Sequence, residues 1–386
     1  MMKFAFRKSH TKRIAVADIG SASAGFALLE LSSGGPARVV HSSRATIPIE
    51  ERTPQATMAA ISAELLRIGQ ETMNNRAKAG DTGRPESIYC VLRAPWSFSE
   101  SVRADSSYEG DVEVAEEMIK ELAHQALARG STVNTENFLE ANVAQVRLNG
   151  YPTASPEGKF AHSIAVVGLV SGSEQWVRAS LQGTLDKLLP HTPIVWRSGA
   201  RALIAAIQAA YPHRDEYFAA EVGGEGTMFA VVREGAPEKQ CFVPQGVNAV
   251  IRAVSKKGTL PEDTLSLIRM IGRDQCERSQ CDELIKDLAR TEPELMRSFG
   301  ECMAKCAEPR KLPDRMVLFA HTDMAQWLAR FFARIDFTQF TRTTQPFEVK
   351  TLEPADLAHW VEPVSGISLD SGLAIAGALV NIEDSA

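Results

Sequence analysis

The residues best suited to chemistry lie where an apolar run ends in an acid and a glycine turn. In IAVADIGSASAGFALLEL, residues 14–31, Asp18 closes the run, and Gly20 and Ser21 form the turn. Backbone N–H groups and hydroxyls of such a turn can hold phosphate, and the neighbouring carboxylate can orient a hydrated Mg²⁺. The simpler alternative is that Asp18 only shapes the turn, because aspartate bonds its own backbone and Gly20 supplies free dihedral angles. This stretch alone leaves both interpretations open.

The same pattern returns in the second half of the chain. In YFAAEVGGEGTMFAVVREG, residues 217–235, Glu221 closes an apolar run, Gly223 and Gly224 form the turn, and Thr227 starts a second run. A repeated order of strand, acid, glycine turn and strand indicates an internal duplication. We therefore expect two similar lobes that face one cleft.

Length and composition fit a protein of two or more lobes. The chain has 386 residues, more than one core usually supports, and its 44% hydrophobic and 23% charged residues are ordinary for a globular protein. The formal net charge of -6 and the scattered Lys and Arg residues argue against nucleic acid as a partner. No apolar run approaches the roughly 20 residues that span a bilayer, and no signal peptide follows the basic start. We expect a cytoplasmic protein without direct membrane insertion.

The cysteine pattern predicts reduced thiols and no disulfides, because the six cysteines of the chain show no close pairing across loops. Four of them, Cys276, Cys281, Cys302 and Cys306, fall in one region with helical character. In a helix, cysteine behaves as a small buried hydrophobe. A zinc-stabilised interaction module is the alternative, although zinc sites usually have tighter ligand spacing.

Apolar periodicity predicts the elements that position these residues. Alternating patterns indicate strands, and apolar residues at helical spacing indicate helices. Thr53 before Pro54 is a typical helix start. The expected strands are 14–19, 25–31, 37–48, 88–94, 138–148, 163–169, 194–196, 217–221, 227–232, 240–244 and 314–320, and the expected helices are 54–73, 111–129, 173–189, 198–210, most of 247–305, 324–335 and 369–380.

Taken in order, these patterns resemble the actin-like ATPase superfamily, in particular the branch that holds the cell-division protein FtsA and the type IV pilus assembly protein PilM. Residues 14–31 are similar to that family's first phosphate loop, and EVGGEGT, residues 221–227, is similar to its second. Residues 317–332 stand where the family has its adenosine loop. RLNGYPTASPEGK, residues 147–159, is similar to part of the branch's inserted domain, and SGLAIAGALV, residues 371–380, resembles the family's last helix. The resemblance spans nearly the whole chain.

The resemblance implies an α/β, actin-like fold, in which two ribonuclease H-like lobes are related by duplication and carry a small inserted α+β domain. The first lobe would comprise residues 1–95 and 171–212, and the inserted domain residues 96–170. The second lobe would comprise residues 213–386, including a helical subdomain at about 247–312.

The resemblance also implies a cleft for ATP and Mg²⁺. Two hairpin loops would hold the phosphates from opposite sides, and acids at the strand ends would hold Mg²⁺ through water. Asp18 and Glu221 would be these metal-side carboxylates. The residues around the phosphates would be Gly20, Ser21, Gly223, Gly224 and Thr227.

Several positions depart from the family pattern. Glu221 stands where the family has Asp, Glu225 stands at a glycine position, and Ala320 and His321 replace two glycines of the adenosine loop. The Glu225 carboxylate would face phosphate charge, and like charges at ~4 Å repel by several kcal/mol. We therefore expect a degenerate ATPase with weak or lost hydrolysis, leave nucleotide binding open, and assign no catalytic residue. His321 is expected to be packed or at the surface, and the turn at Asp323 to cap a helix.

The end of the chain bears on the choice within this branch. FtsA-type proteins carry an amphipathic membrane helix at the C-terminus, whereas this chain stops at NIEDSA, residues 381–386. PilM-type proteins instead bind the cytosolic tail of an inner-membrane partner, PilN. The resemblance thus implies a cytoplasmic scaffold of a type IV pilus or related secretion system, peripheral to the inner membrane through that partner, with self-association left open. The alternatives are an FtsA-like division protein that forms filaments and a small-molecule kinase of the same fold.

Overall fold

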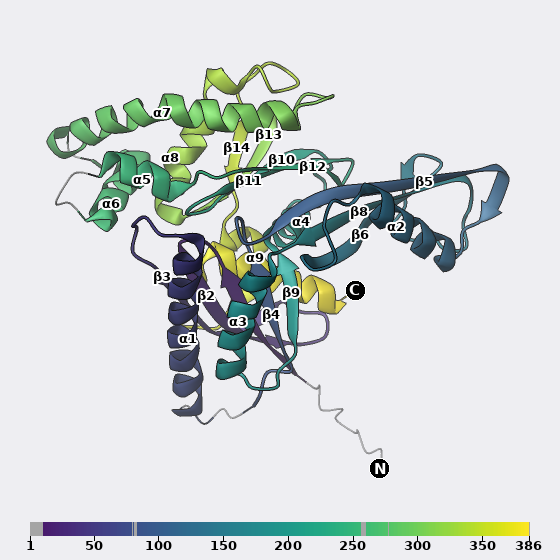
Figure 1. The fold of residues 1–386 in the computed structure, drawn as a ribbon, viewed down its shortest axis with the longest axis horizontal. Coiled ribbons are helices and arrows are strands. Elements are labelled where there is room, and N and C mark those ends of the chain that lie inside the picture. Colours follow the sequence, from purple (N-terminus) through teal and green to yellow (C-terminus); the bar gives the residue numbers. More distant parts are fainter. Residues whose placement is uncertain (1–10, 79, 81–82, 256–259, 277, 386) are drawn as a thin grey trace, which may run out of the picture.

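Two similar sheets form the body of the molecule, and a third sheet projects from it, as Figure 1 shows. The computed structural model describes residues 11–78, 80, 83–255, 260–276 and 278–385. The basic start of the chain therefore lies outside the described residues.

The first sheet begins with the three strands that the sequence predicts at 14–19, 25–31 and 37–48. β1 runs antiparallel to β2 and parallel to β4. Ala15 and Ala17 of β1 are buried on one face of the sheet, and Ile14 and Val16 on the other, because successive strand residues alternate. β1 is therefore apolar on both faces until it reaches Asp18. The strands are β1 (Lys12–Ile19), β2 (Ser23–Leu31), β3 (Ala37–Thr46), β4 (Ser87–Leu92), β9 (Ile194–Ser198) and β15 (Val361–Pro363), in the order β15-β3-β2-β1-β4-β9.

Helices cover both faces of this sheet. Met58, Ile61 and Leu65 of α1 pack beside Leu181 of α3 on one face. The opposite face packs against the apolar side chains of α4 and α9. The four helices are α1 (Pro54–Lys78), α3 (Gln175–Leu188), α4 (Gly199–Ala210) and α9 (Ser371–Ser385).

The second sheet repeats the plan of the first. β10 runs antiparallel to β11 and parallel to β13, as β1 does to β2 and β4. Glu221 is the second-last residue of β10, and Asp18 is the second-last residue of β1. The repeated order confirms the predicted duplication. The strands are β10 (Tyr217–Val222), β11 (Thr227–Arg233), β12 (Ala236–Val243), β13 (Arg315–Ala320) and β14 (Glu348–Thr351), in the order β12-β11-β10-β13-β14.

The helices that pack on the second sheet enclose a core rich in aromatic rings. Phe229 of β11 stacks on Phe218 and meets Phe299 and Phe332 edge to face. One helix starts at Pro261 and ends at Gly272, within the segment 247–305 that was expected to be mostly helical. Among the described residues, no helix combines the length and apolar character needed to cross a membrane. The helices are α5 (Val247–Val254), α6 (Pro261–Gly272), α7 (Arg278–Cys306) and α8 (Thr322–Phe332).

The third sheet comes from the segment between β4 and α3 and has its own small core. Val102 and Val166 of this sheet are buried there together with Leu122 of α2 (Glu116–Gly130). The predicted start of the helix at residue 111 is wrong, because residues up to Glu113 belong to a strand and the helix begins at Glu116. The antiparallel strands are β5 (Phe98–Glu113), β6 (Phe138–Leu148), β7 (Tyr151–Pro152) and β8 (Phe160–Gly172), in the order β5-β8-β6-β7.

The last part of the chain returns to the first sheet. β15 pairs in parallel with β3, and α9 lies over β1, β2 and β3. Gly377 allows the close approach of α9, since a Cβ there would lie 2.9 Å from Val361 Cγ2. The domain boundaries expected from the sequence stay a proposal. The structure adds that residues 361–385, which were assigned to the second lobe, pack on the first sheet. Two short 3₁₀ helices precede them, Ile335–Phe337 and Pro354–Leu357.

The structure contradicts the prediction of reduced thiols for four cysteines. Cys241 is joined to Cys306, and Cys276 to Cys281. The first pair is 65 positions apart and meets because α7 packs on β12, which spacing in the sequence does not reveal. The cysteines also do not converge on one point, because Cys281 and Cys302 lie at opposite ends of α7, about 30 Å apart by the helical rise. Among the described residues, no group of three or more potential metal ligands was found.

Candidate functional site

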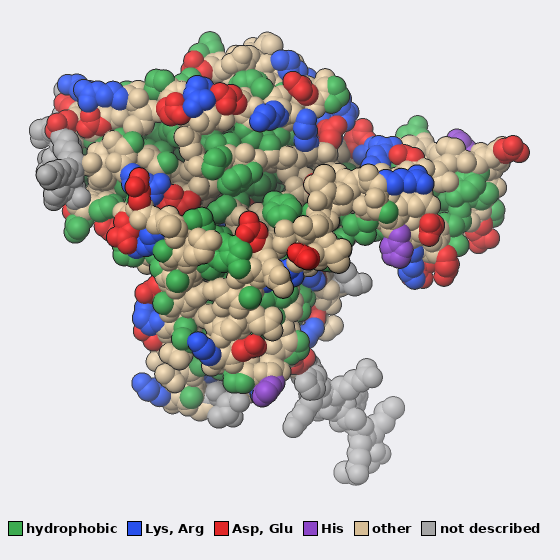
Figure 2. All heavy atoms as spheres, in the orientation of Figure 1, with side chains coloured by type: hydrophobic (Ala, Val, Ile, Leu, Met, Phe, Trp, Pro, Cys, Tyr) green, Lys and Arg blue, Asp and Glu red, His purple; other side chains and the backbone are tan. Residues whose placement is uncertain are grey.

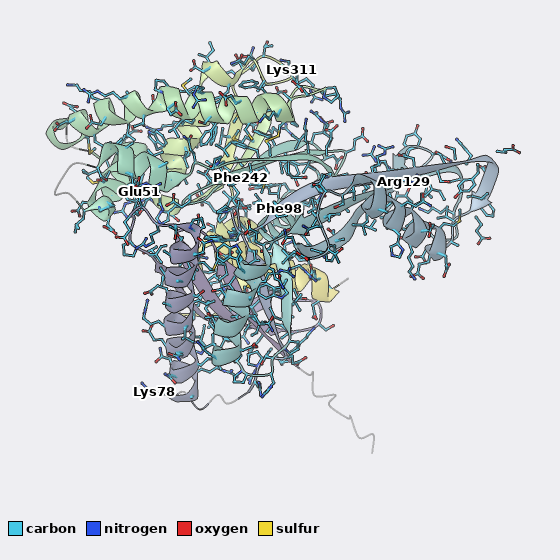
Figure 3. All side chains as sticks on the ribbon, viewed as in Figure 1. Glu51, Lys78, Phe98, Arg129, Phe242 and Lys311 are labelled. Carbon is cyan, nitrogen blue, oxygen red and sulfur yellow. A yellow bond between two sulfur atoms is a disulfide. The ribbon has the colours of Figure 1, made fainter. Side chains whose placement is uncertain are left out.

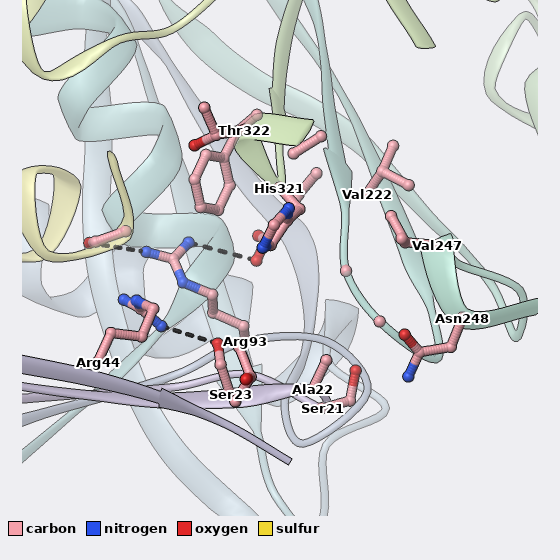
Figure 4. A pocket seen from close by; sticks show the side chains of 18 of the residues that line it. Ser21, Ala22, Ser23, Arg44, Arg93, Val222, Val247, Asn248, His321 and Thr322 are labelled. Atoms are coloured by element: carbon pink, nitrogen blue, oxygen red, sulfur yellow. Dashed lines mark hydrogen bonds and ion pairs between the residues drawn. The ribbon is translucent and has the colours of Figure 1, made fainter. Parts of the chain in front are cut away.

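The two strand-turn units face each other across a cavity of about 260 Å³, drawn in Figure 4. Thr227 does not line this cavity; it is buried below it, and its hydroxyl donates to the Gln245 carbonyl at 2.8 Å. The roles assigned to these residues from the sequence stay predictions. The cavity brings together six of the predicted site residues, namely Asp18, Gly20, Ser21, Glu221, Gly223 and Gly224.

Arg93 lies at the centre of the cavity, where sequence reasoning had placed no cation. It directly follows β4, and its backbone N–H donates to the Ile19 carbonyl at 2.9 Å. Because β4 runs parallel to β1, this position brings the Arg93 side chain alongside Asp18. The Arg93 Nε donates to Asp18 Oδ1 at 2.6 Å.

Both terminal nitrogens of the Arg93 guanidinium also have partners. Nη1 donates to Glu221 Oε1 at 3.3 Å, and Nη2 donates to the Gly372 carbonyl at 3.1 Å. The guanidinium carbon lies 4.5 Å from the centre of the Phe319 ring, a cation–π contact. Burial alone would lower the pKa of Arg93, but the Asp18 and Glu221 carboxylates raise it, so the side chain is a cation. This one cation contacts four different parts of the chain.

A second arginine adds another cation to this cluster of acids. Arg44 Nη2 lies 2.6 Å from Asp18 Oδ2 and 2.9 Å from Asp370 Oδ1. Asp18 therefore has one guanidinium on each oxygen. Burial would raise the pKa of Asp370, but Arg44 holds it below the usual aspartate value. The acids of the first lobe are paired within the chain.

Glu221 is the least satisfied member of this cluster. Its side chain is buried, and Oε2 has no hydrogen-bond partner among the described residues. Burial raises the pKa of Glu221, and Arg93 offsets this only in part. Gly199, at the start of α4, leaves room for the carboxylate, since a Cβ there would lie 3.2 Å from Oε2.

The turns that follow the two acids touch each other directly. Ser21 Oγ accepts a hydrogen bond from the Glu225 backbone N–H at 2.9 Å. The Glu225 carboxylate does not line the cavity, contrary to expectation, because Arg252 binds both of its oxygens at 2.8 Å and Asn248 donates to one at 2.8 Å. These bonds hold the pKa of Glu225 below its ordinary value, although burial opposes them. The charge at the family's glycine position is thus neutralised by α5.

The first N–H groups of α5 are also occupied. Those of Val247 and Asn248 donate to the carbonyls of Gly223 and Gly224, each at 2.9 Å. A helix start can bind an anion only with N–H groups that have no other partner. These two groups are already used to hold the second turn.

The far side of the cavity is mainly apolar. It is lined by Ile47 and Ile49 after β3, Ile251 of α5 and Leu265 of α6. His321 also lines it; the residue is exposed, but partial desolvation by the surrounding chain lowers the pKa of its imidazole. The turn at Asp323 was predicted to cap a helix. In the structure His321 caps α8, because its Nδ1 accepts a hydrogen bond from the Asp323 N–H at 3.3 Å.

Comparisons with known proteins address the fold. No protein-family model and no curated protein sequence matches the chain. Among solved structures, a chain of the PilM–PilN type IV pilus biogenesis complex superimposes with a TM-score of 0.60 at 15% identity, covering 96% of this chain and 98% of that chain. The chain has an actin-like ATPase fold. The ethanolamine utilization protein EutJ from Carboxydothermus hydrogenoformans follows with a TM-score of 0.44, 10% identity and coverage of 96% and 89%.

An actin-like fold raises the question of whether Mg²⁺ fits between Asp18 and Glu221. Mg²⁺ demands near-octahedral oxygen ligands and keeps several waters. The Arg93 guanidinium lies between the two carboxylates, and Arg44 binds the second Asp18 oxygen. The residues present therefore do not fit the metal at this point.

Proposed function

We propose that the protein is a cytoplasmic actin-like scaffold of a type IV pilus or related secretion machine, which binds the cytosolic tail of an inner-membrane protein. The observation that supports this most directly is the superposition on a chain of the PilM–PilN complex over nearly the full length of both chains. The superimposed length includes the small sheet formed by β5 to β8, which projects from the body.

The charge balance of the cleft supports a scaffold rather than an ATPase. The acids that would hold a metal are paired with Arg93 and Arg44, and the turn residue Glu225 is paired with Arg252. A protein that works by nucleotide turnover needs these groups free for phosphate and metal. A protein that works by presenting a fixed surface does not.

A surface suited to a peptide tail lies at the root of the projecting sheet. Phe98 of β5 and Phe242 of β12 remain 45% and 44% exposed, and both line a hollow of about 140 Å³. Figure 3 places the two rings near each other, and Figure 2 shows hydrophobic side chains where the lobes meet this sheet. Met228 lies at the bottom of the hollow, and Gln240 adds a polar group at its side. We propose that the tail of the membrane partner docks here with an apolar side chain between the two rings.

The test is a titration of the purified protein with fluorescently labelled peptides that correspond to the cytosolic tails of inner-membrane proteins encoded beside it. Phe98→Ser combined with Phe242→Ser should weaken binding about tenfold or more, as is typical when central aromatic anchors are removed. The matched control is Phe160→Ser, which removes a still more exposed ring (64%) at the other end of β8 and should leave the affinity unchanged. If no tail binds, the proposed function is wrong. If binding is equal in all three proteins, the docking surface is wrong.

A further inference from the structure

We propose that Arg93 is a built-in cation that takes the place of a divalent metal and joins the two lobes without any metal or nucleotide. This inference does not depend on the identity of the membrane partner, since it concerns only the interior of the cleft.

The position of Arg93 follows from the duplication. Asp18 and Glu221 are equivalent residues of the two central strands, and each comes just before a glycine turn. Their carboxylates meet across the cleft on the same guanidinium, at 2.6 and 3.3 Å. A single cation between equivalent acids of two lobes is the arrangement that a bridging metal would otherwise provide.

Burial makes such a cation necessary. Asp18, Glu221 and Arg93 are 1%, 2% and 5% exposed. Carboxylates removed from water in this way are costly unless a cation and hydrogen bonds compensate them. Because Arg93 is part of the chain, its charge stays in the cleft at any concentration of free metal.

The contacts of Arg93 also tie separate segments together. The side chain starts from the first lobe after β4, binds Glu221 of β10, and binds the Gly372 carbonyl in the first turn of α9. The Phe319 ring of β13 covers it from the second sheet. Close by, the Ser21 hydroxyl and the Glu225 N–H join the two turns. The closed arrangement of the cleft is thus held by the chain's own groups.

The test is thermal unfolding of the wild-type protein and of Arg93→Ala, each in millimolar Mg²⁺ or Mn²⁺ and in EDTA. The wild-type transition should be the same in all three solutions. Arg93→Ala should unfold several degrees lower in EDTA and regain a measurable part of the loss with either metal. The variant leaves the Glu221 carboxylate without a cation and exposes Asp18 Oδ1 to that carboxylate, while Arg44 still binds Asp18 Oδ2. No response to metal in the variant, or an equal response in the wild type, would overturn the proposal.

The matched control is Arg201→Ala, outside the cleft. Arg201 lies 2.8 Å from Glu140 and 2.7 Å from Glu383. Its removal therefore also breaks ion pairs of one arginine with two acids from distant segments. This variant should lose stability without any recovery by metal. A recovery equal to that of Arg93→Ala would mean that the metal acts nonspecifically, and would overturn the proposal.

A milder variant and a direct measurement cover the case in which Arg93→Ala does not fold. Arg93→Gln retains a side-chain amide that can donate to Asp18, and should show the same recovery with Mn²⁺. Electron paramagnetic resonance then counts Mn²⁺ bound to the wild-type protein itself. Bound Mn²⁺ at the cleft of the wild type, lost in Asp18→Asn, would show that Arg93 does not replace the metal.

Discussion

Replacing Gly224 with alanine tests whether the two turns are in contact across the cleft. A Cβ at Gly224 would lie 2.5 Å from the Ala22 Cβ, 3.1 Å from the Ala22 nitrogen and 3.2 Å from Asn248 Nδ2. The φ angle of Gly224 lies outside the left-handed region, so the substitution acts through space and not through backbone strain. The added methyl group can fit only if the two turns move apart.

The size of the effect follows from the contact distances. Ordinary contacts of a Cβ begin at 3.4 Å, so the turns must separate by about 1 Å. The hydrogen bond from the Glu225 N–H to Ser21 Oγ, now 2.9 Å long, would then be lost. Overpacking of this kind costs about 1–3 kcal/mol and one hydrogen bond about 1 kcal/mol. We expect Gly224→Ala to lower the free energy of unfolding by about 3 kcal/mol.

Equilibrium unfolding in urea measures this loss, with two comparisons. Gly183→Ala in α3 adds a methyl group that meets nothing within 4 Å, and should raise stability by up to about 1 kcal/mol. Adding Ala22→Gly to Gly224→Ala removes the opposing methyl group and should restore most of the loss, as a double-mutant cycle detects. Wild-type stability in Gly224→Ala, or no restoration by Ala22→Gly, would refute the closed contact between the turns.

Two further predictions concern charge and covalent bonds. Because the pKa of Glu225 is lowered by its hydrogen bonds with Arg252 and Asn248, its charged form stabilises the fold above the ordinary glutamate pKa, and this contribution disappears as the pH falls through the lowered value. Urea midpoints of the wild type should therefore fall more steeply than those of Glu225→Gln between about pH 5 and pH 3, and equal slopes would contradict the pairing. Without reductant, Cys306→Ser should lower the free energy of unfolding by about 4 kcal/mol and Cys281→Ser by about 2 kcal/mol. The first loss is larger because the disulfide between Cys241 and Cys306 closes the longer loop. Equal losses would contradict this ranking.

The regular parts of the fold could be predicted because their signals are local. The runs that end at Asp18 and Glu221 are apolar on both faces and stop at glycine turns, so they identify the central strands of two duplicated sheets. Of the sheet between β4 and α3, the sequence predicted β6 and part of β8, at 138–148 and 163–169, but not β5. The start of α2 was placed too early because Val112 extends β5 in an amphipathic stretch that suits either element.

The decisive parts of the candidate site depend on contacts between distant residues. Arg93 is 75 positions from Asp18, 128 from Glu221 and 279 from Gly372, so its sequence neighbours say nothing about its partners. One signal was available, because a charged residue directly after the buried strand SIYCVL must find a partner at that edge of the sheet. β15 has only three residues and no periodicity, so its pairing with β3 could not be read from the sequence.

The return of the last segment to the first sheet has a consequence for biosynthesis. β3 gains its partner β15, and the face of β1 and β2 gains its cover α9, only from residues 361–385. The Gly372 carbonyl that binds Arg93 belongs to the same segment. On the ribosome, the apolar face of β1, β2 and β3 that α9 covers therefore stays open until residues 361–385 have been translated. Chains stalled before this segment emerges should therefore be cleaved by proteases faster than chains that contain it.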